Sequence, residues 1–245
     1  MLDVLKKLER QWSQRTFLVR GIVSRIRHSP LSLCNWVVDR LCDHYVDRKF
    51  GIASSKRLYL ADLAIELPDC VHYQPTSYSD FSELLATVAI RPNQDVFLDF
   101  GAGMGRVVCL AATYPFRSVI GVELSASLCL IAKRNIDNVR SKLRCQDIKI
   151  VNVNAVDYTV PDEASMIFFF NPFRGSVMEK VFANIVASLR AKPRRVLILF
   201  YGDSATVSAN VKLMHAHHID SITNVMLPTG AVGAVFDVKP EDLYR

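Results

Sequence analysis

Short apolar runs alternate with amphipathic segments over most of the chain after its first 70 residues. Almost wholly apolar runs are typical of strands that a parallel sheet buries on both faces, and apolar positions repeated every three to four residues indicate helices between them. We therefore predict an α/β fold. Its strands are expected at 96–100, 117–123, 147–153, 165–170, 195–200, 219–227 and 231–238, with helices at 107–112, 177–189 and 204–214 and another that Ser125 caps.

The N-terminal part of the chain has a different pattern. Leu5, Leu8 and Trp12 share one helical face, and the apolar spacing that follows predicts two or three amphipathic helices in all. We accordingly divide the chain into a helical extension, residues 1–70, and an α/β domain, residues 71–245. Helices of this kind pack on a domain, cover its substrate or lie on a membrane surface, and the pattern leaves these roles open.

A glycine-rich turn follows the first predicted strand. The sequence D-F-G-A-G-M-G places Gly101, Gly103 and Gly105 between that strand and a helix, with Asp99 two residues before the first glycine. Glycines let a ligand lie directly on the backbone, and the first N–H groups of the helix favour an anionic group there. The spacing differs from the G-x-G-x-x-G fingerprint of dinucleotide-binding proteins, which argues against an NAD(P) oxidoreductase. Glu123 ends the next strand, where a carboxylate can accept both hydroxyl protons of a ribose.

The glycine turn followed by G-V-E resembles motifs I and II of the class I S-adenosylmethionine-dependent methyltransferases. The resemblance covers the chain from about Tyr73 to its end. It implies a Rossmann-like, doubly wound, seven-stranded sheet whose last strand is antiparallel, with S-adenosylmethionine as cofactor. Asp99, the three glycines and Glu123 are then expected to bind that cofactor.

Further site residues follow from the same resemblance. In Y-Q-P-T, Tyr73 and Thr76 are expected beside the methionine end of the cofactor. Asn154 stands where the family usually has an acidic residue that accepts from the adenine amino group, and Asp157 is an alternative. Two further residues, Asn171 and Phe173 of N-P-F-R, fall at the end of the fourth strand, beside the reactive methyl group; we assign them and Tyr73 to catalysis.

The nature of the acceptor is predicted more coarsely. The span from Tyr73 to Phe173 resembles uncharacterised bacterial methyltransferases similar to the non-SET histone-lysine methyltransferases, while N-P-F also resembles the N-P-P-F/Y motif of amino-methylating nucleic-acid enzymes. No histidine, cysteine or carboxylate near this motif looks like a general base, which favours amine acceptors. We expect a protein lysine; a nucleic acid, a small-molecule amine and a non-catalytic, cofactor-binding partner protein stay open as alternatives.

Composition adds to this in a few respects. The net charge of +6 is concentrated in residues 1–60, which hold 12 Lys and Arg against 5 Asp and Glu, so the N-terminal helices could contact a nucleic acid. Six scattered cysteines without a C-x-x-C motif predict reduced, packed thiols. His215 and His218 lack the further ligands of a metal site, so we predict no metal. No run has the length of a membrane span and the N-terminus has no signal-peptide core, so we expect a soluble, cytoplasmic protein.

Overall fold

The computed structural model describes residues 43–56, 58 and 73–244. Except for residues 43–56 and 58, the predicted helical extension therefore lies outside the described residues, and its division from the domain at residue 70 stays a prediction. Residues 43–50 are helical, and the described residues from Asp47 onward belong to one compact unit. Within the described ranges, no helix is both long and apolar enough to cross a bilayer.

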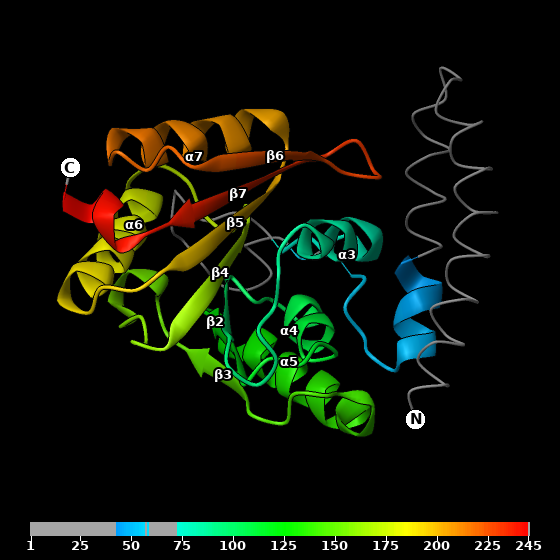
Figure 1. The fold of residues 1–245 in the computed structure, drawn as a ribbon. Helices are drawn as coiled ribbons and strands as arrows, with labels where there is room; N and C mark the ends of the chain where they lie inside the picture. Colours follow the sequence, from blue (N-terminus) through cyan, green and yellow to red (C-terminus); the bar gives the residue numbers. More distant parts are fainter. Residues whose placement is uncertain (1–42, 57, 59–72, 245) are drawn as a thin grey trace, which may run out of the picture. The chain divides into compact units, whose positions relative to one another are not determined.

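The described part of the chain forms one seven-stranded sheet in the order β3-β2-β1-β4-β5-β7-β6 (Figure 1). Strands β1 to β5 pair in parallel, and β7 pairs antiparallel with both β5 and β6. This confirms the predicted doubly wound sheet with its antiparallel closing hairpin. The strands are β1 (Val96–Phe100), β2 (Ser118–Glu123), β3 (Ile148–Asn152), β4 (Ala164–Phe170), β5 (Val196–Gly202), β6 (Ile222–Met226) and β7 (Val232–Val238).

Helices cover both faces of the sheet. Figure 1 shows α3, α4 and α5 on one side and α6 and α7 on the other. Short polar side chains fix where several of them begin: Ser77, Ser125 and Asp203 each accept a hydrogen bond from a backbone N–H in the first turn of α3, α5 and α7. The helices are α3 (Tyr78–Ala86), α4 (Arg106–Ala111), α5 (Ala126–Val139), α6 (Gly175–Ala191) and α7 (Ser204–Ala216), and the 3₁₀ turn η3 spans Ala155–Asp157.

Aromatic rings fill the core on both faces of the sheet. Towards α6 and α7, the rings of Phe100, Phe169 and Phe200 stack across three neighbouring strands, with centroids 5.2 Å apart at each step. Towards α3, Phe81 meets Phe168 edge to face at 5.5 Å. Burial of whole rings makes strands β1, β4 and β5 a rigid platform, because packed aromatic side chains leave little freedom to the backbone beneath them.

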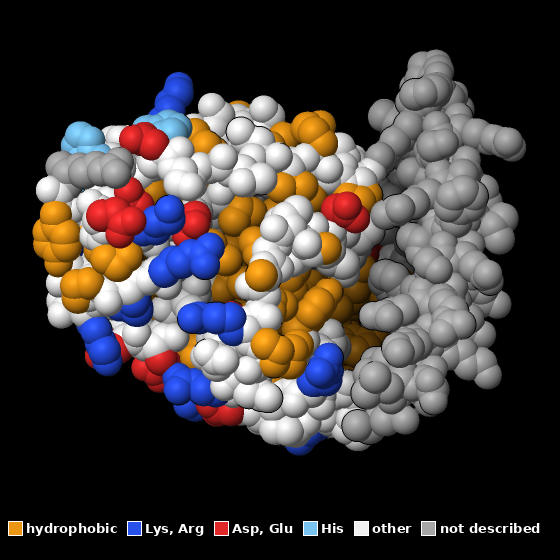
Figure 2. Space-filling view, in the orientation of Figure 1, with side chains coloured by type: hydrophobic (Ala, Val, Ile, Leu, Met, Phe, Trp, Pro, Cys, Tyr) orange, Lys and Arg blue, Asp and Glu red, His pale blue; other side chains and the backbone are white. Residues whose placement is uncertain are grey.

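The surface is mixed in charge. Figure 2 shows apolar side chains gathered toward the middle of one face, with Lys, Arg, Asp and Glu mainly around them. Cys109, Cys129 and Cys145 are buried free thiols, as predicted, while the other three cysteines lie outside the described residues. In the part of the chain that the structure describes, no group of three or more His, Cys, Asp or Glu side chains could hold a metal ion. His215 instead pairs with Asp220 at 2.8 Å.

Candidate functional site

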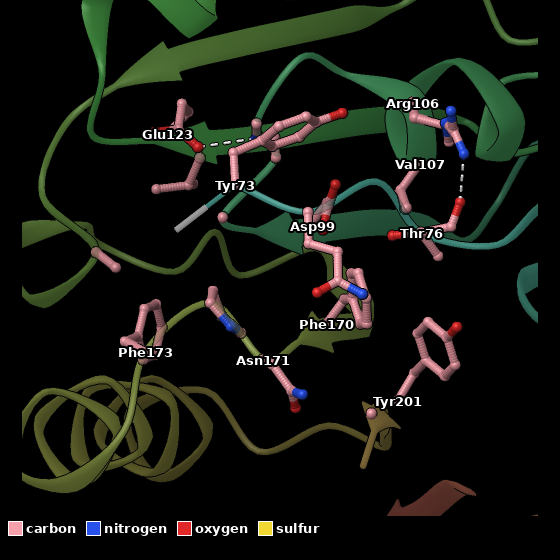
Figure 3. A pocket seen from close by; sticks show the side chains of 18 of the residues that line it. Tyr73, Thr76, Asp99, Arg106, Val107, Glu123, Phe170, Asn171, Phe173 and Tyr201 are labelled. Atoms are coloured by element: carbon pink, nitrogen blue, oxygen red, sulfur yellow. Dashed lines mark hydrogen bonds between the residues drawn. The ribbon is translucent and has the colours of Figure 1, made fainter. Parts of the chain in front are cut away.

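A pocket of about 690 Å³ opens at the carboxyl ends of β1, β2, β4 and β5. Parallel α/β sheets bind ligands at this edge, and the volume lies within the range usual for small-molecule sites. Of the ten site residues predicted from the sequence, nine line the pocket: Tyr73, Thr76, Asp99, Gly101, Gly103, Glu123, Asn154, Asn171 and Phe173. Figure 3 labels six of these: Tyr73, Thr76, Asp99, Glu123, Asn171 and Phe173. The tenth, Gly105, does not line it, and neither does Asp157, the alternative to Asn154.

Each glycine of the turn has a positive φ, between +54° and +79°. A Cβ at Gly101 would lie 2.4 Å from Pro172, and one at Gly103 would lie 2.3 Å from the ring of Tyr73. A Cβ at Gly105 would instead meet Ala132 of α5 at 2.9 Å. The first two glycines therefore let the backbone form the pocket wall, whereas the third allows α4 to pack closely on α5.

Glu123 is held at the mouth of the glycine turn. Its two carboxylate oxygens accept hydrogen bonds of 2.8 Å, one from the N–H of Gly103 and one from the N–H of Ser125. Burial raises the pKa of Glu123, and these backbone hydrogen bonds oppose the rise. A carboxylate has about four acceptor positions, so Glu123 keeps acceptor capacity for a hydroxyl-bearing ligand.

Asp99 is a buried carboxylate with an unsatisfied oxygen. The residue is 2% exposed, and its Oδ2 has no hydrogen-bond partner. Burial, followed by the negative charge of Glu123, raises the pKa of Asp99 well above its ordinary value. An unpaired buried acceptor is costly unless a ligand supplies the missing donor. This atom therefore fits a cationic group such as the ammonium of an amino acid.

Asn154 lies at the other side of the pocket, before η3. Its Oδ1 accepts from the N–H of Val156 at 3.2 Å, so that the side chain caps this 3₁₀ turn. Asn154 lines the pocket and Asp157 does not. Of the two candidates for an adenine contact, the geometry thus favours Asn154.

Tyr73 and Thr76 border the turn from the segment before α3. The ring of Tyr73 lies against Gly103, and its hydroxyl donates to the carbonyl of Ser54 at 2.6 Å. Thr76 is 5% exposed, and its carbonyl accepts from Arg106 at 2.7 Å. Both residues are thus fixed by contacts with chain segments distant in sequence.

Asn171 ends β4 in an unusual conformation. Its φ is +42°, which is uncommon for a residue with a side chain. Nδ2 donates to Oδ2 of Asp203 at 3.2 Å, while Oδ1 is buried over Gly202 without a partner. Backbone strain together with an unsatisfied amide oxygen is typical of functional positions rather than of structural turns.

The pocket end near Asn171 is aromatic. Phe173 lines the pocket but is 7% exposed and packs edge to face on Phe169 at 6.1 Å, so most of its ring belongs to the core. The rings of Phe170 and Tyr201 stack with centroids 4.5 Å apart, and both line the pocket. The sequence analysis missed this pair, since Phe170 was predicted to end a buried strand and Tyr201 to follow directly after another.

A buried carboxylate supports this aromatic wall. Asp80 accepts from the hydroxyl of Tyr201 at 2.9 Å and from the N–H and hydroxyl of Thr229 in the turn between β6 and β7. Burial is the largest cause of the strongly raised pKa of Tyr201, so this phenol stays protonated. Asp80 therefore fixes one side of the pocket from α3, a role that only the folded chain reveals.

Comparison with known proteins gives a family and a fold. A family model described as "Histone methylation protein DOT1" matches residues 70–193. Similar solved structures include a SAM-dependent methyltransferase from Aquifex aeolicus (10% identity, 65% of this chain and 89% of that one, TM-score 0.52). Another is a precorrin 8w decarboxylase from Methanobacterium thermoautotrophicum (16% identity, 71% and 96%, TM-score 0.51). At such identities these structures show the fold alone. A search of curated proteins found no match.

Proposed function

The chain belongs to the DOT1 family of histone methylation proteins, and from this premise we propose that it methylates an amine, the side-chain amine of a protein lysine. It is a methyltransferase enzyme with S-adenosylmethionine as cofactor. The observation that carries the amine proposal is the unpartnered amide oxygen of Asn171 at the end of β4. An amide oxygen accepts a hydrogen bond from an amine N–H but does not deprotonate a hydroxyl or a carbon acid.

The order of the polar residues along the pocket suggests how the cofactor lies. Figure 3 shows Glu123 on one side of Asp99 and Thr76 on the other. We assign the ribose and adenine to Glu123 and Asn154, and the amino-acid end to Asp99 and Thr76. This orientation gives the unsatisfied oxygen of Asp99 a cationic partner and leaves Glu123 its hydroxyl-accepting positions.

The bound cofactor supplies an electrophilic methyl group on a sulfonium sulfur. The chain's own task is then to hold a neutral amine in line with that methyl group and to exclude water. Phe170 and Tyr201 provide the apolar wall, with Phe173 behind Asn171. Among the described residues that line the pocket there is no His or Cys, and Asp203 is the carboxylate nearest to Asn171.

Asp203 and Asn171 would act in succession on the incoming amine. Hydrogen bonds from Thr206 lower the pKa of Asp203, so this half-exposed carboxylate is ionised at neutral pH and attracts an ammonium group. The amine loses its proton to solvent before transfer. The Asn171 side chain then turns from Gly202 toward the pocket, where Oδ1 gains the hydrogen bond that it lacks in the absence of a ligand.

A labelled-methyl assay tests this proposal. The protein is incubated with methyl-tritiated S-adenosylmethionine and a cell lysate, and the product is treated with proteinase or nuclease before acid hydrolysis. We expect proteinase-sensitive label that co-elutes with methyllysines. Asn171→Ala should abolish it, whereas Asn224→Ala, the same change at an exposed position of β6, should not. If the label survives proteinase but is released by nuclease, the acceptor is a nucleic acid and not a protein lysine.

A further inference from the structure

Arg106 is a buried cation with no part in the chemistry proposed above. It is the first residue of α4, directly after the glycine turn, and is 2% exposed. Its Nε donates to the Ser54 hydroxyl at 2.8 Å, Nη1 to the Thr76 carbonyl at 2.7 Å, and Nη2 to the Ser55 hydroxyl at 3.0 Å. The guanidinium also lies 4.5 Å from the ring centroid of Tyr78. The Arg106 side chain thus connects α4 to the segment at Ser54 and Ser55 and to the segment at Thr76 and Tyr78.

Asp47 is the counter-ion of this arginine. Its Oδ1 lies 3.1 Å from Nη2 of Arg106, and Asp47 is 3% exposed. The carboxylate also accepts from the N–H and hydroxyl of Ser54, from the hydroxyl of Ser55 and from the hydroxyl of Tyr78. Almost every polar atom of this cluster therefore has a partner. We call Asp47, Ser54, Ser55, Tyr78 and Arg106 the arginine cluster.

Net stability does not explain such a cluster. Two charges lose their hydration on burial, and well-packed apolar residues would often be equally stable or better. What the hydrogen bonds provide is direction, because a planar guanidinium has its five donors in a fixed arrangement. The cluster fixes the segments around Ser54 and Thr76 relative to the glycine turn.

The position of the cluster relates it to one end of the pocket. In Figure 3, Arg106 and Thr76 lie on the side of Asp99 away from Glu123. Ser54 extends the cluster toward the pocket, since its carbonyl accepts from Tyr73, whose ring lies on Gly103. Thr76, which borders this end, is therefore held directly by Arg106, and Tyr73, which Figure 3 shows between Glu123 and Asp99, is held through Ser54.

We propose that Asp47 and Arg106 are positioning residues for the amino-acid end of the cofactor, acting through Tyr73 and Thr76. The inference rests on the cofactor orientation given under the proposed function. It separates two parts of one ligand: the cluster aligns the surface facing the homocysteine moiety, while Glu123 and Asn154, across the pocket, face the nucleoside. Loosening the cluster should weaken recognition of the first part and leave the second unchanged.

Two ligands that share a nucleoside test this separation. S-Adenosylhomocysteine carries the amino-acid moiety and 5′-methylthioadenosine lacks it. We expect Asp47→Asn to raise the Kd of S-adenosylhomocysteine about tenfold, which corresponds to the loss of one hydrogen bond to a charged group. The same variant should change the Kd of 5′-methylthioadenosine less than about twofold. Calorimetric titration measures both constants. Tyr78→Phe, which keeps the ring under Arg106 but removes one hydrogen bond to Asp47, should act in the same direction.

A matched control separates positioning from general destabilisation. Asp95 is another buried carboxylate, 4% exposed and bonded to Arg91 and Ser165 at the opposite end of β1. Asp95→Asn should lower the melting temperature without changing the ratio of the two Kd values. If Asp47→Asn and Tyr78→Phe weaken both ligands equally, or change the ratio no more than Asp95→Asn, the cluster is structural only and the inference is wrong. If the wild-type protein binds neither S-adenosylhomocysteine nor 5′-methylthioadenosine, the proposed function itself is wrong.

Discussion

Asp99 shows how a single residue can oppose stability and serve binding. Its carboxyl is buried beside the negative charge of Glu123, with one oxygen unpaired. Because its pKa is higher in the folded than in the unfolded chain, the folded state binds more protons, and its contribution to stability falls as the pH rises above about 4 toward the folded pKa.

We predict that Asp99→Asn stabilises the ligand-free protein at pH 8 and weakens cofactor binding. The neutral amide avoids the buried charge, so the melting temperature should rise by roughly 2–4 °C, the shift for about 1 kcal/mol in a chain of this size. The same change removes the charge opposite the ligand's ammonium, so the Kd of S-adenosylmethionine should increase at least about tenfold. Scanning fluorimetry and calorimetry measure the two effects. The account would be wrong if the melting temperature of Asp99→Asn, compared with wild type at the same pH, were less favourable at pH 8 than at pH 5.

Asp203 determines which end of the Asn171 amide is free. A carboxylate only accepts hydrogen bonds, so it binds Nδ2 and leaves Oδ1 available. Asp203→Asn keeps a good helix cap for α7, because the new Oδ1 can still accept from the Thr206 N–H. The new amide nitrogen, however, would face Nδ2 of Asn171, donor against donor.

We therefore expect Asp203→Asn to lower kcat about tenfold with little change in the KM for S-adenosylmethionine. Thr206→Val is the matched control, since it removes a hydroxyl bonded to the same carboxylate oxygen but leaves Asn171 its acceptor. Steady-state kinetics on the labelled acceptor gives both constants. Equal losses of kcat in the two variants would show that the cap matters rather than the amide.

At the scale of helices and strands, local sequence was sufficient for most of the fold. Ser125 marks the start of α5 as predicted, because its side chain bonds to an N–H group only three residues away. The apolar run at 165–170 became β4 within one residue. These features depend on neighbours in sequence, and the glycine turn, Glu123 and Asn171 were located by the same kind of signal.

The parts that the sequence could not predict depend on contacts between distant segments. Arg106 bonds Ser54 across 52 positions, and Asp80 bonds Tyr201 across 121. In the sequence, Arg106 is only one charged residue before an apolar helix, and nothing in its neighbours indicates burial. The positive φ of Asn171 is equally hidden, and the next residue, Pro172, packs on Gly101, which is distant in sequence.

The third glycine provides a test of how closely two helices approach. Gly105→Ala should destabilise the protein more than Gly230→Ala, although both residues have similar positive φ, +78° and +87°. A Cβ at Gly230 meets no atom within 4 Å, so this variant shows backbone strain alone; at Gly105 it meets Ala132 at 2.9 Å. We expect a further ~1–3 kcal/mol for Gly105→Ala from overpacking, measured by urea unfolding. Equal losses of unfolding free energy in the two variants would mean that α4 and α5 move apart without an energetic cost.

At the scale of the whole molecule, the buried thiols report on global unfolding. Burial raises the pKa of Cys109 to about 12 and that of Cys129 to about 11, so little thiolate exists at pH 8. We predict that iodoacetamide leaves Cys109, Cys129 and Cys145 unlabelled in the folded protein and labels them in urea. Mass spectrometry of the three peptides measures this. Rapid labelling of Cys109 without denaturant would show that α4 opens locally.

The sheet order also bears on solubility at high concentration. The outermost strands of the described sheet are β3 and β6, each five residues long. Lys149 of β3 and Asn224 of β6 are exposed on these margins. Short edge strands that carry a charged or polar side chain at an interior position are poor templates for strand addition by another molecule, whereas the longer aromatic strands β4 and β5 lie inside the sheet. The segments most prone to form intermolecular sheets are therefore shielded for as long as the chain stays folded.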